Sequence, residues 1–102
     1  MSSVALAVSE LVLGPGESDG PYRYLLGNEQ WLLVLSGRPT LRHLDGVEVL
    51  EPGDLVAFGE GPSGAHEVRC DTDGPARVLV LTTSQRPFVE VRPDTNERLV
   101  HE

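Results

Sequence analysis

Two segments decide the fold: Gln30-Trp31-Leu32-Leu33-Val34-Leu35-Ser36-Gly37 and Leu50-Glu51-Pro52-Gly53-Asp54-Leu55-Val56-Ala57-Phe58. Each contains a short run rich in Val, Leu and aromatic residues, which favours a β-strand. A glycine marks the chain reversal next to each strand: Gly37 follows the first strand and Gly53 precedes the second. Glycine suits such reversals because it adopts backbone torsions that other residues avoid. The two segments therefore indicate two parts of one small β-barrel.

The same pattern of short apolar runs between turn residues continues along the chain. The other runs predicted to be strands are residues 10–13, 40–44, 47–50, 67–70, 77–82 and 88–91. Asp45-Gly46 lies between two of them and is typical of a two-residue hairpin turn, in which both central positions need positive φ. No window sustains helical spacing of apolar residues, so no long helix is expected. Many short, evenly spaced strands predict an all-β sandwich or closed barrel.

The composition is that of one globular domain with a strongly acidic charge. The 102 residues are enough for a single domain, residues 1–102, with one modest core. The net charge is −8, from 16 acidic and 8 basic residues. Such a charge repels phosphate groups, so neither nucleic acid nor a membrane is an expected partner. Residues 1–8 lack a basic segment before their short apolar one, so no signal peptide is expected and the predicted location is the cytoplasm.

Four segments also share their order with those of a known family. They are Glu29-Gln30 with the strand ending at Gly37, then Pro39-Thr40-Leu41-Arg42, then residues 50–58, and finally Gly61-Pro62-Ser63-Gly64-Ala65-His66. Together they resemble a small single-domain bacterial cupin of the conserved-barrel type. The resemblance covers about residues 9–97, including residues 88–94, which are similar to the closing strand of one cupin subgroup. It implies a double-stranded β-helix, or jelly-roll barrel, which is often a homodimer and binds its ligand or metal in the barrel mouth.

The resemblance also implies where a metal would be bound. The first cupin motif supplies two inward-pointing histidines, separated by one residue, and a glutamate three or four residues further on; the second motif supplies another histidine. Gln30 stands at the glutamate position, and only His66 matches a ligand. The two histidine positions of the first motif are filled by Arg23 and Leu25 or, in the alternative register, by Tyr24 and Leu26.

These residues do not predict a stable metal site. A divalent transition metal generally needs three or four nitrogen, sulfur or carboxylate ligands, and Cys70 is the only cysteine. Gln30 is a neutral, weak ligand, and Arg23, if it points inward, places a positive charge where the cation would lie. No cofactor is therefore expected. The remaining route to a weakly held divalent metal is a site made by His66 and His43.

The same positions favour binding of a small polar or anionic molecule without a metal. Arginine presents a planar guanidinium suited to carboxylate or phosphate, and glutamine both donates and accepts hydrogen bonds. The predicted ligand-binding residues are Arg23, Tyr24, Gln30, His43 and His66. Each has a structural alternative: Arg23 outside the barrel and paired with an acid, Gln30 closing a strand end, and the histidines as hydrogen-bonded residues of the core.

Two other functions stay open. The first is a metal-independent isomerase, epimerase or cyclase with His66 as general base and Tyr24 as acid, although Glu29 and Glu67 both have the wrong strand parity to orient His66. The second is a cupin with a degenerate metal site or a purely structural dimer.

Trp31, opposite in parity to Gln30, is expected to point away from the pocket and to serve a dimer interface.

Overall fold

The computed structural model describes residues 6–102, which form ten strands and one short 3-10 helix. Their bounds are β1 (Leu6–Leu13), β2 (Tyr24–Leu26), β3 (Gln30–Ser36), β4 (Thr40–His43), β5 (Gly46–Val49), β6 (Leu55–Phe58), η1 (Pro62–Gly64), β7 (His66–Arg69), β8 (Ala76–Thr83), β9 (Phe88–Arg92) and β10 (Glu97–His101). No helix in this part of the chain is long and apolar enough to cross a membrane. The expectation that the N-terminus is no signal peptide concerns mainly residues 1–5, outside the described residues.

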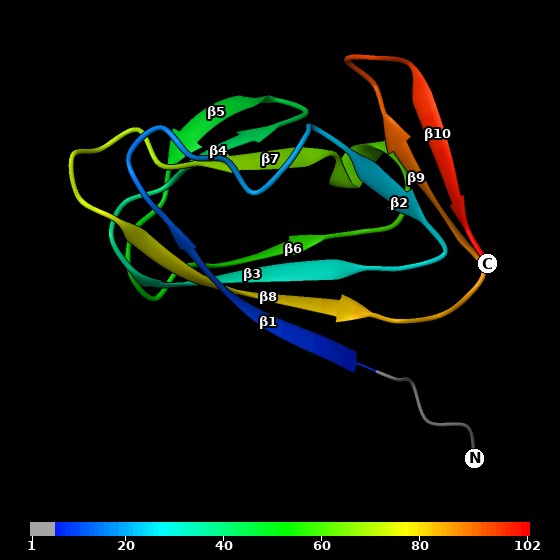
Figure 1. Ribbon diagram of the computed structural model, residues 1–102, viewed down its shortest axis with the longest axis horizontal. Helices are drawn as coiled ribbons and strands as arrows, with labels where there is room; N and C mark the ends of the chain where they lie inside the picture. Colours follow the sequence, from blue (N-terminus) through cyan, green and yellow to red (C-terminus); the bar gives the residue numbers. More distant parts are fainter. Residues whose placement is uncertain (1–5) are drawn as a thin grey trace.

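The strands form two layers that face each other (Figure 1). One layer is a sheet in the order β1-β8-β3-β6. The other contains β5-β4-β7 and β2-β9-β10, and a pair of backbone hydrogen bonds between Arg23 and His66 joins these two halves. All strand pairs are antiparallel. The predicted all-β jelly-roll barrel is confirmed.

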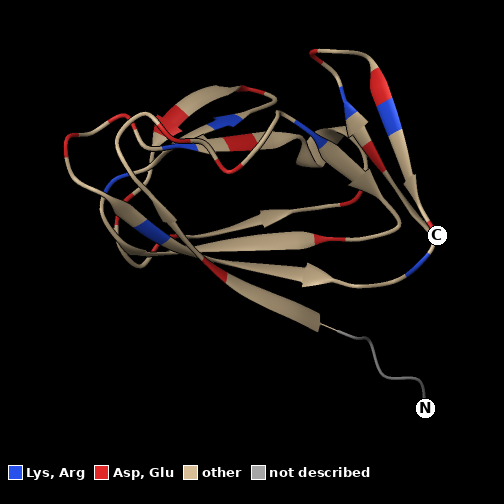
Figure 2. Cartoon of the chain, in the orientation of Figure 1, with Lys and Arg blue, Asp and Glu red and all other residues tan. Residues whose placement is uncertain are grey.

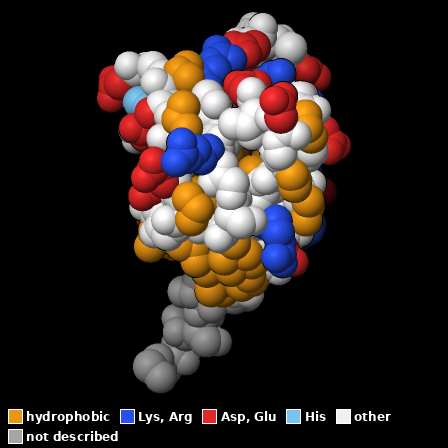
Figure 3. All heavy atoms as spheres, turned by 90° about the vertical axis from the view of Figure 1, so that its left-hand side faces the viewer, with side chains coloured by type: hydrophobic (Ala, Val, Ile, Leu, Met, Phe, Trp, Pro, Cys, Tyr) orange, Lys and Arg blue, Asp and Glu red, His pale blue; other side chains and the backbone are white. Residues whose placement is uncertain are grey.

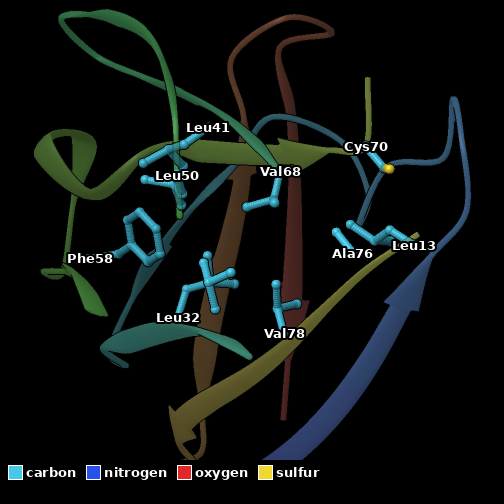
Figure 4. Packing of buried hydrophobic residues seen from close by; sticks show 10 residues of the cluster. Leu13, Leu32, Leu41, Leu50, Phe58, Val68, Cys70, Ala76 and Val78 are labelled. Atoms are coloured by element: carbon cyan, nitrogen blue, oxygen red, sulfur yellow. The ribbon is translucent and has the colours of Figure 1, made fainter. Parts of the chain in front are cut away.

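The core lies between the layers and is built from alternate residues of the strands. In β3, Leu32 and Val34 are almost completely buried, whereas their neighbours along the strand point outward. Figure 4 shows Leu32 and Val78 of one layer facing Leu41 and Val68 of the other. Each large apolar side chain buried in this way stabilises the fold by about 1.5 to 3 kcal/mol. Cys70 also lies in this core as a buried free thiol.

Gly37 and Gly53 both occupy positions that disfavour other residues. Their φ angles are 81° and 91°, in the left-handed region where a Cβ atom is strained. At Gly37 space is also lacking, because a Cβ would lie 2.6 Å from the carbonyl oxygen of Pro75. The predicted role of these glycines in reversing the chain is therefore correct.

The sequence-based strand assignment differs from the structure in a few places. It missed β2, which has only three residues, and β10, whose charged residues give no apolar run. Strand β1 begins at Leu6 rather than residue 10. The predicted hairpin turn, Asp45-Gly46, lies one residue too far along the chain. In the structure His43 pairs with Gly46, so Leu44 and Asp45 form the turn. Gly46 alone takes the positive φ, 138°.

Candidate functional site

His66 lies inside the barrel as a neutral, hydrogen-bonded side chain. It is the first residue of β7, is 3% exposed and stacks on Phe58 with the ring centroids 3.5 Å apart. Its Nδ1 lies 2.8 Å from the carbonyl oxygen of Gly64, which requires Nδ1–H as donor and leaves the lone pair on Nε2. Burial, and then the positive charge of Arg23, lower the pKa of His66 to about 4.

Arg23 is paired within the protein rather than free for a ligand. Its guanidinium donates to both carboxylate oxygens of Asp19, at 3.2 and 3.1 Å, and to the carbonyl oxygen of His66 at 3.2 Å. The Asp19 side chain is only 1% exposed, and it also accepts a hydrogen bond from the backbone N–H of Val68. Of the structural alternative for Arg23, the pairing with an acid is therefore observed, whereas the side chain is only 12% exposed and does not lie outside the barrel.

Gln30 lies on the same face of β3 as the core residue Leu32. Its backbone pairs with Phe58 on one side and Thr82 on the other, and its side-chain Nε2 donates to Thr82 Oγ1 at 3.1 Å. Phe58 therefore has Gln30 as its strand partner and His66 as its stacking partner. The amide of Gln30 is held within the β1-β8-β3-β6 sheet. None of the pockets described below is lined by Arg23, Gln30 or His66.

The donors at the cupin ligand positions do not fit a metal ion. His66 supplies one imidazole nitrogen, Gln30 an amide and Leu25 no ligand atom, while Arg23 adds positive charge close to His66. Among residues 6–102 no group of three or more His, Cys, Asp or Glu side chains is placed to hold a metal. This donor set lacks the carboxylate and the further imidazoles that a divalent cation needs.

The structure does not bring Tyr24 and His66 together. Arg23 pairs directly with His66, so the next residue, Tyr24, projects from the opposite face of the strand. His43 does lie opposite His66 in the β4–β7 ladder. His43 lines a separate cavity of about 220 Å³ with Phe58 and Glu48 among its walls. The proton transfer pair predicted from the sequence is therefore not assembled.

Tyr24 instead lines a larger pocket on the outer face of its layer, which we name the tyrosine pocket. The pocket has a volume of about 400 Å³. Its lining residues are Tyr22, Tyr24, Leu44, Pro62, Ala65, Val91, Pro93, Asn96 and Arg98. Tyr24 and Arg98 both pair with Val91, from either side of β9, which places the phenol and the guanidinium on one face. Leu44 of the β4–β5 turn and Pro93 and Asn96 of the β9–β10 turn line the pocket, and Figure 1 shows where these two turns lie in the fold.

Arg98 lines the tyrosine pocket, whereas Arg42 lies behind its wall against the ring of Tyr22 and is bound by an acid. Arg42 donates two hydrogen bonds to Asp94, at 2.7 and 3.0 Å, and lies 3.9 Å over the ring of Tyr22. These hydrogen bonds hold the pKa of Asp94 below its usual value. Within residues 6–102 no acidic side chain forms an ion pair with Arg98. Arg98 is therefore the charged group of the pocket that is available to a ligand.

The sequence did not predict Tyr22, Asn96 or Arg98 as site residues. Asn96 and Arg98 belong to the β9–β10 hairpin, and β10 was not recognised as a strand. Their position near Tyr24 depends on the pairing of β2 and β10 with β9, which no local pattern specifies. The Asp-Thr-Asn run at residues 94–96 is the one available signal, since such residues favour a turn.

The family is established by sequence: residues 9–82 match the cupin domain family, and the chain belongs to it. A sugar phosphate isomerase of the cupin superfamily from Silicibacter pomeroyi DSS-3 has a similar structure, with 25% identity and a TM-score of 0.92 over 98% of this chain and 63% of that one. A candidate sugar phosphate isomerase from Acidithiobacillus ferrooxidans ATCC 23270 has 25% identity and a TM-score of 0.90, over 95% and 62%. The chain thus spans less than two thirds of either protein.

A third solved structure shares the fold alone. It is a cupin 2 conserved barrel domain protein from Salinispora arenicola CNS-205, with 24% identity and a TM-score of 0.59 over 78% of this chain and 63% of that one. No curated protein matches the chain.

Proposed function

We propose that the chain binds a small phosphorylated or carboxylated molecule in the tyrosine pocket, without a metal. The observation that carries this proposal is Arg98, a guanidinium without an acidic partner among residues 6–102, beside two tyrosines in a chain of net charge −8. An arginine left unpaired among so many acids is available for a bidentate contact with phosphate or carboxylate.

The shape and chemistry of the pocket support a ligand of sugar size. Its volume of about 400 Å³ lies within the range usual for small-molecule sites. Leu44, Val91 and the two prolines provide apolar walls, while the tyrosine hydroxyls and Asn96 can bond hydroxyl groups of a ligand. Arg23 and Gln30, predicted as ligand residues, are left out of this proposal because their side chains already bond Asp19 and Thr82.

The similar structures favour a sugar phosphate as the first ligand to test. Two of them are named for sugar phosphate isomerase activity, one as a candidate, and cover 98% and 95% of this chain. A metal-independent isomerase is therefore the second candidate function. His66 is a poor candidate for its general base, because a pKa of about 4 makes the imidazole a weak base. Tyr24 cannot act together with His66, because it faces away from Arg23, the strand partner of His66.

Calorimetric titration with sugar phosphates tests the binding proposal. Arg98→Met is expected to weaken binding by about 1.5 to 3 kcal/mol, the usual contribution of a hydrogen bond to a charged group. Arg38→Met is the matched control, because Arg38 is also exposed and forms no ion pair among residues 6–102. An equal loss of affinity in both variants, or no binding of any phosphate or carboxylate compound to the wild type, would refute the proposed site.

The isomerase alternative needs a separate measurement. Aldose and ketose phosphates are incubated with the protein and a metal chelator, and their interconversion is followed by NMR. Conversion that Tyr24→Phe abolishes would place catalysis in the tyrosine pocket, whereas binding without conversion would leave the chain as a binding protein.

A further inference from the structure

The strand ladders of residues 6–102 leave two walls of the tyrosine pocket unpaired. One wall is Tyr22, which precedes β2 and belongs to no strand. The other is the β9–β10 turn, residues 93–96, which contributes Pro93 and Asn96 to the pocket. Arg98 follows this turn in β10. The distance between the Tyr22 ring and the guanidinium of Arg98 therefore depends on side-chain contacts as well as on the backbone.

One side chain, Arg42 of β4, contacts both walls. Its guanidinium carbon lies 3.9 Å from the centre of the Tyr22 ring, where the face of the ring attracts a cation. Its two Nη atoms donate to the two carboxylate oxygens of Asp94, at 2.7 and 3.0 Å. Within residues 6–102 these are the hydrogen bonds that connect the β9–β10 turn to another element. Arg42 therefore joins the two walls to each other.

The geometry of this contact compensates for its partial exposure. The side chains of Arg42 and Asp94 are 42% and 52% exposed, and a simple ion pair at such a position contributes little. Here two parallel hydrogen bonds and a ring stack act on the same planar guanidinium, so they fix its orientation as well as its position. Figure 2 shows acidic and basic residues following each other along the β9–β10 hairpin. Among the acids of this hairpin, Asp94 is the one that reaches β4.

We propose that Arg42 is a positioning residue for ligand binding in the tyrosine pocket, an inference that rests on the proposed function for its ligand. By holding Tyr22 and the β9–β10 turn together, Arg42 fixes where Asn96 and Arg98 stand relative to the phenol rings. Arg42 does not line the pocket, so it acts through these neighbours. Groups that are already in place lose less conformational entropy when the ligand binds, which raises the affinity.

Replacing Asp94 by asparagine separates positioning from charge. The substitution removes a negative charge, and electrostatics alone would then strengthen the binding of an anionic ligand. Figure 3 shows acidic side chains spread over the upper part of the face that it displays, so the loss of one acid changes the overall field only slightly. Positioning predicts the opposite result. The turn loses its contact with Arg42, which still has Glu67 as an ion-pair partner, with the Glu67 Oε1 3.9 Å from its Nη1.

Calorimetric titration with glucose 6-phosphate as the probe measures this difference. Asp94→Asn is expected to raise the Kd by about 3- to 10-fold. Glu97→Gln is the matched control, because it removes the same charge from the same hairpin. Glu97 forms no ion pair among residues 6–102, and glutamine can still accept the hydrogen bond from Thr95. The control is expected to leave the Kd unchanged or slightly lower. An Asp94→Asn variant that binds as tightly as the wild type or more tightly, or an equal loss in both variants, overturns the inference.

NMR of the ligand-free protein tests the contact itself. The side-chain protons of Arg42 lie over the ring of Tyr22, so in the wild type they are expected to resonate upfield of their usual positions. Asp94→Asn is expected to reduce this upfield shift and Glu97→Gln to preserve it. A wild type without the shift, or the full shift in Asp94→Asn, overturns the inference without any ligand. Failure of the proposed function is recognised separately: the wild type then binds no phosphate or carboxylate compound, while the ligand-free shifts still behave as expected.

Discussion

Replacing His66 by glutamine is expected to remove a pH-dependent part of the stability. The folded-state pKa of His66 is about 4, below the value of about 6.5 for an unfolded chain. Between these two values the unfolded chain binds the proton more strongly, so the free energy of unfolding falls as the pH decreases. The contribution is fully present above about pH 6.5 and is lost progressively down to about pH 4. At 1.36 kcal/mol per pKa unit, the loss amounts to about 3 kcal/mol.

Urea unfolding of the wild type and of His66→Gln, from about pH 7 to about pH 4, measures this contribution. Loss of the stack on Phe58 costs the same at every pH, so the change in the difference between the two proteins isolates the titration of His66. That difference is expected to change by about 3 kcal/mol over the range. NMR titration of the His66 ring measures the folded-state pKa directly. A difference that is constant with pH, or a ring that titrates near pH 6.5, would refute the reasoning from burial and from Arg23.

Three further substitutions test the packing and the buried ion pair. Gly37→Ala places a Cβ 2.6 Å from the carbonyl oxygen of Pro75 at a φ of 81°, and is expected to lower the free energy of unfolding by about 1 to 3 kcal/mol; an unchanged thermal midpoint would contradict this. Leu32→Ala, in the core, is expected to cost about 3 kcal/mol in chemical denaturation. Arg23→Met leaves the buried Asp19 carboxylate without its counterion and is expected to cost about 3 to 5 kcal/mol, while the pKa of His66, followed by NMR, rises because a neighbouring positive charge is removed.

The sequence was sufficient to predict most strands because the barrel places alternate residues in one core. Leu32 and Val34 are buried and their neighbours are not, so burial repeats along β3 with the period of a strand. Strand β10 has no such constraint. Among the strands of residues 6–102 it pairs only with β9, and it carries Glu97 and Arg98 at exposed positions, so its sequence shows neither an apolar run nor a regular alternation.

Alternation along the strands predicted less of the candidate site than of the fold. Strand parity placed Gln30 on the inner face of β3, where the structure has it, but parity specifies a direction and not a partner. The ion pair of Arg23 depends on Asp19, in a loop four residues earlier, and on side-chain conformations that alternation does not determine. Arg98 reaches the tyrosine pocket only through pairing between β9 and β10, which joins residues without a common local pattern.

The position of β10 at the edge of its sheet has a consequence for dynamics. Within the described part of the chain, hydrogen bonds hold this strand to β9 on one side only, so its local opening costs less free energy than unfolding of the core. Opening of β10 removes Arg98 from the tyrosine pocket while the facing layers stay packed. The amide protons of β10 are therefore expected to exchange with solvent faster than those of β3 or β8, and a ligand held by Arg98 slows this exchange by stabilising the closed edge.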